Sequence, residues 1–239
     1  MSLTKEALSY LMEEQSKPTF TEVNGQTYSD KRMHRIIHNP KAEPIEMNTL
    51  SSLIDYIKAG IDVIKFPAVI HIQSPTRVEL YTTLDDERIR ERMVVVKARV
   101  PEFRFNNYTE HEAFLIAVQS KFLDTEDKKL ILQFAGTVEN GTVEQYGDDG
   151  VTQKATVKTG IASKSDAIVP NPVKLKAFRT FIEVDQPETE YVFRMRDRSG
   201  VECALFEADG GAWEIKAMEY IKEYLQKELE ENEGFTVIS

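Results

Sequence analysis

Apolar residues recur at helical spacing near both ends of the chain. Leu8, Leu11 and Met12 predict a short amphipathic helix, which ends before Pro18 because proline cannot continue a helix. Near the other end, a second apolar stripe is the clearest helical pattern in the chain and follows a turn at residues 209–211. Its members are Trp213, Ala217, Tyr220, Ile221, Tyr224, Leu225 and Leu229.

Capping residues predict a further helix near residue 50. Asn48 or Thr49 can accept a hydrogen bond from the first turn, and Gly60 stands where a left-handed residue ends a helix. Leu50 and Leu53 lie on one face of this segment. We therefore expect an amphipathic helix between these two signals.

Two more helices are predicted in the middle of the chain. Thr109 and Glu112 form a capping box, in which each side chain accepts a hydrogen bond from the other's backbone. The helix that follows is unusually apolar, so we expect it to be deeply buried. Its apolar members are Phe114, Ile116, Ala117, Val118 and Phe122. Another helix is expected to begin at Asp124 or Thr125.

Short apolar or alternating runs predict β-strands. Asn24-Gly25 predicts a hairpin between flanking strands, because this pair supplies the two positive φ angles of a type I′ turn. The longer runs lie at residues 68–72, 77–82, 93–100, 173–184, 191–196 and 201–208. We expect the first three of these runs to form an antiparallel meander.

Residues 138–171 are mostly polar and contain turn signals at Asn140-Gly141 and Asp148-Asp149-Gly150. A segment of this length with little apolar surface cannot offset its own ordering entropy by local burial. We therefore predict either a protruding hairpin or an arm that packs against another subunit.

These elements predict an α+β fold, with antiparallel meander sheets, several amphipathic helices and an extended polar insertion at residues 138–171. We expect two parts, a helix, hairpin and connector at residues 1–46 and a main domain at residues 47–239. The arrangement loosely resembles the capsid-type shell fold of tailed phages, an analogy that specifies no function.

Composition narrows the classes of function. The chain has 239 residues, of which 41% are hydrophobic, and it contains no run of about 18 apolar residues, so we do not expect a membrane span. The first residues lack the pattern of a secretory signal, which predicts a cytoplasmic protein. Cys203 is the single cysteine, and its apolar neighbours predict a buried thiol.

Charge disfavours nucleic acid as a partner. The chain carries 40 acidic against 30 basic residues, a formal net charge of −10, and phosphate backbones repel such a protein. A local basic segment could override this average. Its candidate nucleic-acid contacts are Lys31, Arg32, His34, Arg35 and Lys41. A second basic set, interpreted as solvated strand faces, comprises Lys174, Lys176, Arg179, Arg194, Arg196 and Arg198.

Candidate chemistry is sparse. His34 and His38 have the spacing of a helical zinc site, but Arg35 stands where the metalloprotease motif needs glutamate. The turn at residues 148–150 lacks the acids of a calcium loop, and the turn at residues 209–211 lacks the lysine of a phosphate loop. We therefore predict no catalytic, cofactor-binding or metal-binding residues, and we expect the chain not to be an enzyme.

Several segments of the chain closely resemble the YfdQ-like family of phage and prophage proteins. The likeness covers most of the chain, and its motifs are residues 49–56, 148–153, 169–173, 179–187 and 206–213. The resemblance implies a phage-encoded protein in the bacterial cytoplasm. It implies no activity, because the family is one of unknown function and has no catalytic residues to carry over.

The expected function is therefore protein binding without catalysis, foremost self-assembly into a homo-oligomer or shell. A phage or host protein is the other expected partner, and no cofactor is expected. The alternative is an accessory role in phage DNA replication or recombination, in which the basic segment at residues 31–41 contacts nucleic acid.

Overall fold

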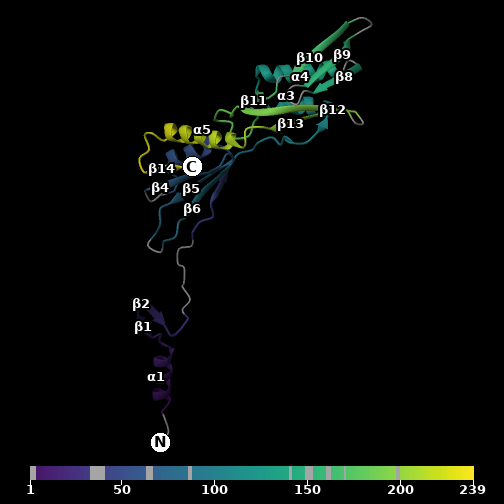
Figure 1. The fold of residues 1–239 in the computed structure, drawn as a ribbon. Helices are drawn as coiled ribbons and strands as arrows, with labels where there is room; N and C mark the ends of the chain where they lie inside the picture. Colours follow the sequence, from purple (N-terminus) through teal and green to yellow (C-terminus); the bar gives the residue numbers. More distant parts are fainter. Residues whose placement is uncertain are drawn as a thin grey trace. The chain divides into compact units, whose positions relative to one another are not determined.

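The computed structural model describes residues 4–32, 41–62, 67–85, 88–139, 142–148, 153–159, 163–169, 171–197 and 200–239. It divides into two compact units, Met1–Lys41 and Ala42–Ser239. Helices and several β-sheets are both present, which confirms the predicted α+β class (Figure 1).

The first unit consists of a helix followed by a hairpin. Helix α1 (Lys5–Ser16) begins after Thr4, whose hydroxyl accepts a hydrogen bond from the Ala7 backbone at 3.3 Å. Strands β1 (Phe20–Val23) and β2 (Gln26–Ser29) pair antiparallel. Asn24 and Gly25 have φ angles of 52° and 75°, which confirms the turn that this dipeptide predicts.

A five-stranded sheet carries the first core of the second unit, in the order β14-β4-β5-β6-β3. Strands β4 (Ala68–Ser74), β5 (Arg77–Thr82) and β6 (Arg92–Lys97) form the predicted antiparallel meander. Two short strands complete it in parallel: β3 (Ile45–Met47) beside β6, and β14 (Phe235–Ile238) beside β4. The sequence patterns did not predict β14.

Helices α2 (Leu50–Ala59) and α5 (Ala212–Glu228) pack on one face of this sheet. The Thr49 hydroxyl accepts a hydrogen bond from the Ser52 backbone at 3.2 Å, and Gly60 has φ 58°, so both predicted caps of α2 are confirmed. The centre of this core consists of apolar side chains from both layers. They include Leu50, Leu53, Ile70, Leu80, Val94, Ile221 and Leu225.

A four-stranded sheet carries the second core, in the order β11-β12-β13-β7. Its strands are β11 (Val173–Leu175), β12 (Thr189–Asp197), β13 (Val201–Glu207) and β7 (Thr109–Glu110), and helices α3 (His111–Lys121) and α4 (Glu126–Glu139) pack against it. The largest side chains of this core are aromatic. They are Phe114, Phe122, Phe134, Tyr191 and Phe193.

The structure corrects the prediction of one long strand at residues 173–184. Only β11 is a strand there, because the buried side chain of Gln186 binds the backbone of the following segment. Its amide oxygen accepts hydrogen bonds from the backbones of Arg179 and Thr180, and its amide nitrogen donates to the carbonyls of Phe181 and Val184. These bonds replace strand pairing and hold an irregular loop.

The start of α3 also differs from the predicted capping box. Glu110 is the capping residue, and its carboxylate accepts hydrogen bonds from the backbones of Glu112 and Ala113, both at 3.0 Å. Thr109 lies one residue before this cap, in strand β7, where it pairs with Cys203 of β13. Burial of the helix is one-sided, since Ile116 is 57% exposed while Phe114 is buried.

The polar insertion folds as a three-stranded antiparallel sheet. Strands β8 (Thr142–Asp148), β9 (Gln153–Thr159) and β10 (Ser163–Val169) lie in the order β10-β9-β8 and contact α4 of the same chain. Pairing within the chain thus satisfies the backbone groups between these strands, while β8 and β10 form the edges of the sheet.

Candidate functional site

Two hollows meet at the segment that links β6 to β7. The first, the α3 pocket, has a volume of about 430 Å³, and the second, the Arg179 pocket, about 350 Å³. Glu102, Phe103 and Lys121 line both hollows. Pockets of this size can hold a small ligand.

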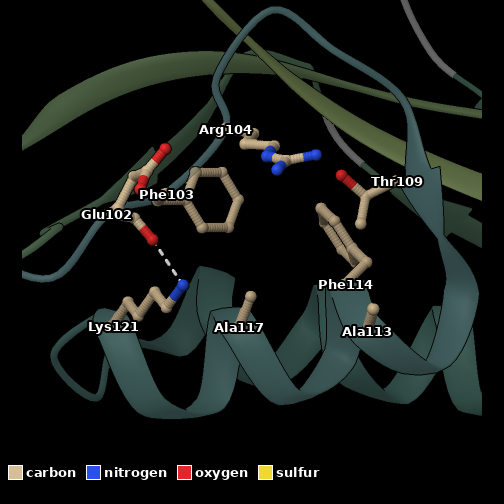
Figure 2. A pocket seen from close by; sticks show the side chains of 8 residues that line it. All are labelled: Glu102, Phe103, Arg104, Thr109, Ala113, Phe114, Ala117 and Lys121. Carbon is tan, nitrogen blue, oxygen red and sulfur yellow. Dashed lines mark hydrogen bonds between the residues drawn. The ribbon is translucent and has the colours of Figure 1, made fainter.

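The α3 pocket lies between one face of α3 and the linking segment (Figure 2). Ala113, Ala117 and Lys121 stand on successive turns of the helix, and the two small alanine side chains leave the space into which the Phe103 ring projects. The Lys121 ammonium donates a hydrogen bond to the Glu102 carbonyl, which fixes the linking segment against the helix end. The small side chains of Ala113 and Ala117 thus leave the pocket open, and the side chain of Lys121 closes one end of it.

Arg179 is the most unusual residue of the second hollow. Its side chain is only 8% exposed, and its guanidinium carbon lies 3.9 Å from the centre of the Phe105 ring and 4.5 Å from that of Trp213. One guanidinium nitrogen, Nη2, donates to Glu207 at 2.6 Å. A buried guanidinium held between aromatic faces is rigid, and its charge is only partly screened by water.

The other guanidinium nitrogen of Arg179 has no such partner. Nη1 is buried, and none of the described residues accepts a hydrogen bond from it. The hydroxyls of Thr189 and Tyr191 are also buried, and they interact with each other. Burial raises the pKa of Tyr191, an effect that the Arg179 charge opposes, so this hydroxyl stays protonated. An unpaired buried donor is costly, so Arg179 Nη1, on a residue that lines the pocket, is a candidate contact for a ligand.

A turn places Trp213 over Arg179. The Asp209 carboxylate accepts hydrogen bonds from the backbones of Gly211 and Trp213, both at 3.1 Å. Gly210 and Gly211 have φ angles of 64° and 87°, which favour glycine. The turn that the sequence predicts at residues 209–211 is therefore confirmed.

A second ionic cluster lies on the face of the five-stranded sheet away from α2 and α5. The Glu79 carboxylate is buried and accepts hydrogen bonds from Arg77, at 2.9 Å from its Nε, and from Tyr81, while Arg92 lies 3.5 Å away. Burial acts to raise the pKa of Glu79, but the hydrogen bonds from Tyr81 and Arg77 and the nearby positive charges outweigh it, so that this pKa is lowered. Because both carboxylate oxygens have partners, we interpret this cluster as structural.

The residues of the basic segment are only partly described. His34, His38 and Arg35 lie outside the described residues, whereas Lys31, Arg32 and Lys41 lie within them. The nucleic-acid contact at residues 31–41 stays a prediction.

For the second basic set, the interpretation as solvated strand faces is wrong at Arg179, which is buried. Arg196 lies on a strand and is paired with Glu202 at 2.6 Å, with its guanidinium 3.7 Å from the centre of the Tyr108 ring. Arg179 follows β11 in an irregular segment, where two phenylalanines, Phe178 and Phe181, flank it. An arginine among aromatic residues is the signal that could have indicated its burial.

The groups capable of covalent chemistry have structural surroundings. Cys203 is buried, and burial raises the pKa of its thiol to about 12, which keeps it unreactive at neutral pH. His111 is buried with its Nε2 at 3.0 Å from the Ala135 carbonyl oxygen. Within the described residues no three acidic, histidine or cysteine side chains gather as a metal site would need. The turn at residues 149–150 lies outside the described residues.

The first unit presents a different kind of surface. None of the side chains of residues 4–32 is buried. Its large exposed apolar residues are Leu8, Tyr10, Leu11, Met12, Phe20, Val23 and Tyr28. We call residues 4–32 the N-terminal arm.

Among the described residues, no helix combines the length and apolar character that a membrane span requires. Comparison with protein families, with characterised proteins and with solved structures found no match. The resemblance to the YfdQ-like family therefore stays a prediction, as do the capsid-type analogy and the cytoplasmic location. The function has to be argued from geometry.

Proposed function

We propose that this chain acts through protein binding rather than catalysis, and that its partner is a second copy joined through the N-terminal arm. The supporting observation is that the arm displays apolar side chains without burying any of them. Helix α1 has 12 residues, and helices of that length are marginal in water without tertiary packing. An isolated two-stranded hairpin is marginal as well.

The apolar stripe of α1 suits an identical partner. In an antiparallel pair of α1 helices centred between residues 9 and 10, Leu8 of each copy lies level with Leu11 of the other. The stripe of each copy therefore meets the stripe of the other, while the acidic residues Glu6 and Glu13, seven positions apart, share the face that points away from the partner. A two-fold pair of this kind buries the same patch on both copies, as isologous interfaces do.

The test compares the mass of the full chain with that of variants by size exclusion with light scattering. We expect an oligomer at micromolar concentration, and we expect Leu8→Ser/Leu11→Ser/Met12→Ser to convert it to monomer. The matched control is Glu6→Ser/Glu14→Ser/Lys17→Ser, which changes the opposite face of the same helix and should leave the mass unchanged. Negative-stain microscopy separates a small oligomer from a shell.

A charge exchange tests whether the partner is the chain itself. Leu8→Glu/Leu11→Glu and Leu8→Lys/Leu11→Lys should each be monomeric through repulsion, and mixing the two variants should restore assembly, because Leu8 of one copy lies level with Leu11 of the other. A monomeric full-length chain at micromolar concentration would contradict the proposal, as would an unchanged mass for the apolar triple variant. The YfdQ-like resemblance suggests the bacterial cytoplasm as the setting for such assembly.

A further inference from the structure

We propose that the Arg179 pocket binds a small carboxylic acid with an apolar body, the carboxylate accepting a hydrogen bond from Arg179 Nη1. This inference is independent of self-assembly, because its residues belong to the second unit and none lies in the N-terminal arm.

The donor is built and oriented before any ligand arrives. Arg179 is stacked between Phe105 and Trp213 and paired through Nη2 with Glu207, so the guanidinium plane is fixed. The second oxygen of Glu207 accepts a hydrogen bond from the Asn106 side chain at 3.2 Å, which fixes the acid in turn. Nη1 is buried and has no acceptor among the described residues. A charged donor held in this way favours an anionic acceptor.

The wall of the pocket defines the body of the ligand. Val100, Pro101, Phe103 and Trp213 supply most of an apolar lining, and the volume is about 350 Å³. Such a lining suits a compact aromatic or branched aliphatic group. Nη1 is itself buried, so the proposal requires the side chain of Trp213, which is partly exposed and lies over Arg179, to move when the ligand binds.

The charges of the lining disfavour a dianion. Arg179 and Lys121 contribute two positive charges to the pocket, and Glu102 and Glu207 contribute two negative charges. A dianionic phosphate would meet two acids with only one unpaired guanidinium nitrogen to receive it. A carboxylate carries one charge and matches the single donor, so the pocket favours carboxylates over phosphates.

Trp213 provides the readout, because it is the single tryptophan of the chain and lines the pocket. We expect phenylacetate to change its fluorescence saturably, with calorimetry giving the same Kd. The neutral isostere 2-phenylacetamide should bind about tenfold more weakly, the effect of losing one charge-assisted hydrogen bond. Acetate, which has no apolar body, should not saturate. Equal affinity for the acid and the amide would overturn the proposal.

Two substitutions locate the binding. Arg179→Met should reduce the affinity for phenylacetate at least about tenfold but leave that for 2-phenylacetamide nearly unchanged. The matched control is Arg196→Met, which removes another arginine that is stacked on an aromatic ring and paired with glutamate. It should leave both affinities unchanged. Unchanged phenylacetate binding in Arg179→Met would refute the assignment.

A second pair of variants tests the proposal independently in case Arg179→Met does not fold. Val100→Phe narrows the pocket at a residue that is 39% exposed, so the fold should tolerate it while the affinities for both probes fall. Ile116→Phe adds the same ring at an exposed position that lines neither pocket and should change neither affinity. If Val100→Phe leaves binding intact, the probe occupies another site and the proposal fails.

Discussion

The two units of the chain obtain their secondary structure in different ways. In the N-terminal arm, Thr4 caps the helix and Asn24-Gly25 turns the hairpin, but no described side chain is buried. In the second unit, the same kinds of local signal act together with two apolar cores. Local signals are therefore sufficient to specify the shape of an element, whereas its stability depends on burial.

This difference also separates the two proposed activities. The arm offers apolar residues on its surface, which suits a partner that brings its own apolar surface. The Arg179 pocket offers a fixed donor inside a folded core, which suits a small ligand. A single chain can therefore carry an assembly surface and a binding site that fail independently.

The largest expected contrast compares two phenylalanines. Phe193 is fully buried against Phe114 and Phe134, with both ring centroids at 5.9 Å, so Phe193→Ala should lower the free energy of unfolding by about 3–5 kcal/mol. Phe20→Ala in the arm should change it by less than about 0.5 kcal/mol. Urea denaturation followed by circular dichroism measures both. Both substitutions are measured in the Leu8→Ser/Leu11→Ser/Met12→Ser variant, so that assembly does not contribute to the free energy of unfolding.

A second prediction concerns the buried amide that holds the loop after β11. Gln186→Ala removes the partners of two backbone donors and two carbonyls, so it should lower the free energy of unfolding by about 2–3 kcal/mol. Gln119→Ala, at an exposed position on α3, is the matched control and should have little effect. A small loss in Gln186→Ala would show that the loop is held by its other contacts.

A third prediction concerns pH. The pKa of Glu79 is lowered below its ordinary value of 4.5, so its ionised form stabilises the fold above pH 4.5, and this contribution is lost as the pH falls through the lowered pKa. Glu79→Gln should therefore be less stable than the parent at neutral pH, with the difference shrinking in acid. Denaturation at a series of pH values checks this. A difference that grows in acid would contradict the assigned direction.

The elements that the sequence predicted well are those whose signals are local. The hairpin at Asn24-Gly25, the caps of α2 at Thr49 and Gly60, and the turn before Trp213 all depend on residues within a few positions. The meander of β4, β5 and β6 was predicted for the same reason, because consecutive strands with short links pair with their neighbours.

The elements that were missed depend on distant partners. Strand β14 pairs in parallel with β4, far away in the sequence, and its short apolar run carries no local signal of that pairing. The predicted strand at residues 173–184 failed because Gln186 binds the backbone in place of a neighbouring strand. Both cases are tertiary contacts that override a local preference.

The candidate site was missed for a related reason. Phe105, Arg179 and Trp213 come from three segments that are separated by more than 30 residues each, and only the fold brings them together. Sequence reasoning found the turn that places Trp213 but assigned Arg179 to a solvated face. Arg179 lies between Phe178 and Phe181 in the sequence, and such aromatic neighbours indicate that a charged side chain is buried.

The smallest expected change in stability comes from two threonine caps, Thr49 and Thr4. Comparing them isolates the role of burial, because both side chains make the same kind of capping bond. Thr49→Ala should lower the free energy of unfolding by about 1 kcal/mol, since α2 is part of a core and loses its capping bond. Thr4→Ala removes the equivalent bond in α1 and should reduce only the local helicity of the arm, measured by amide hydrogen exchange of α1. Equal global losses for the two variants would mean that α1 is coupled to a core, and the contrast between the units would then disappear.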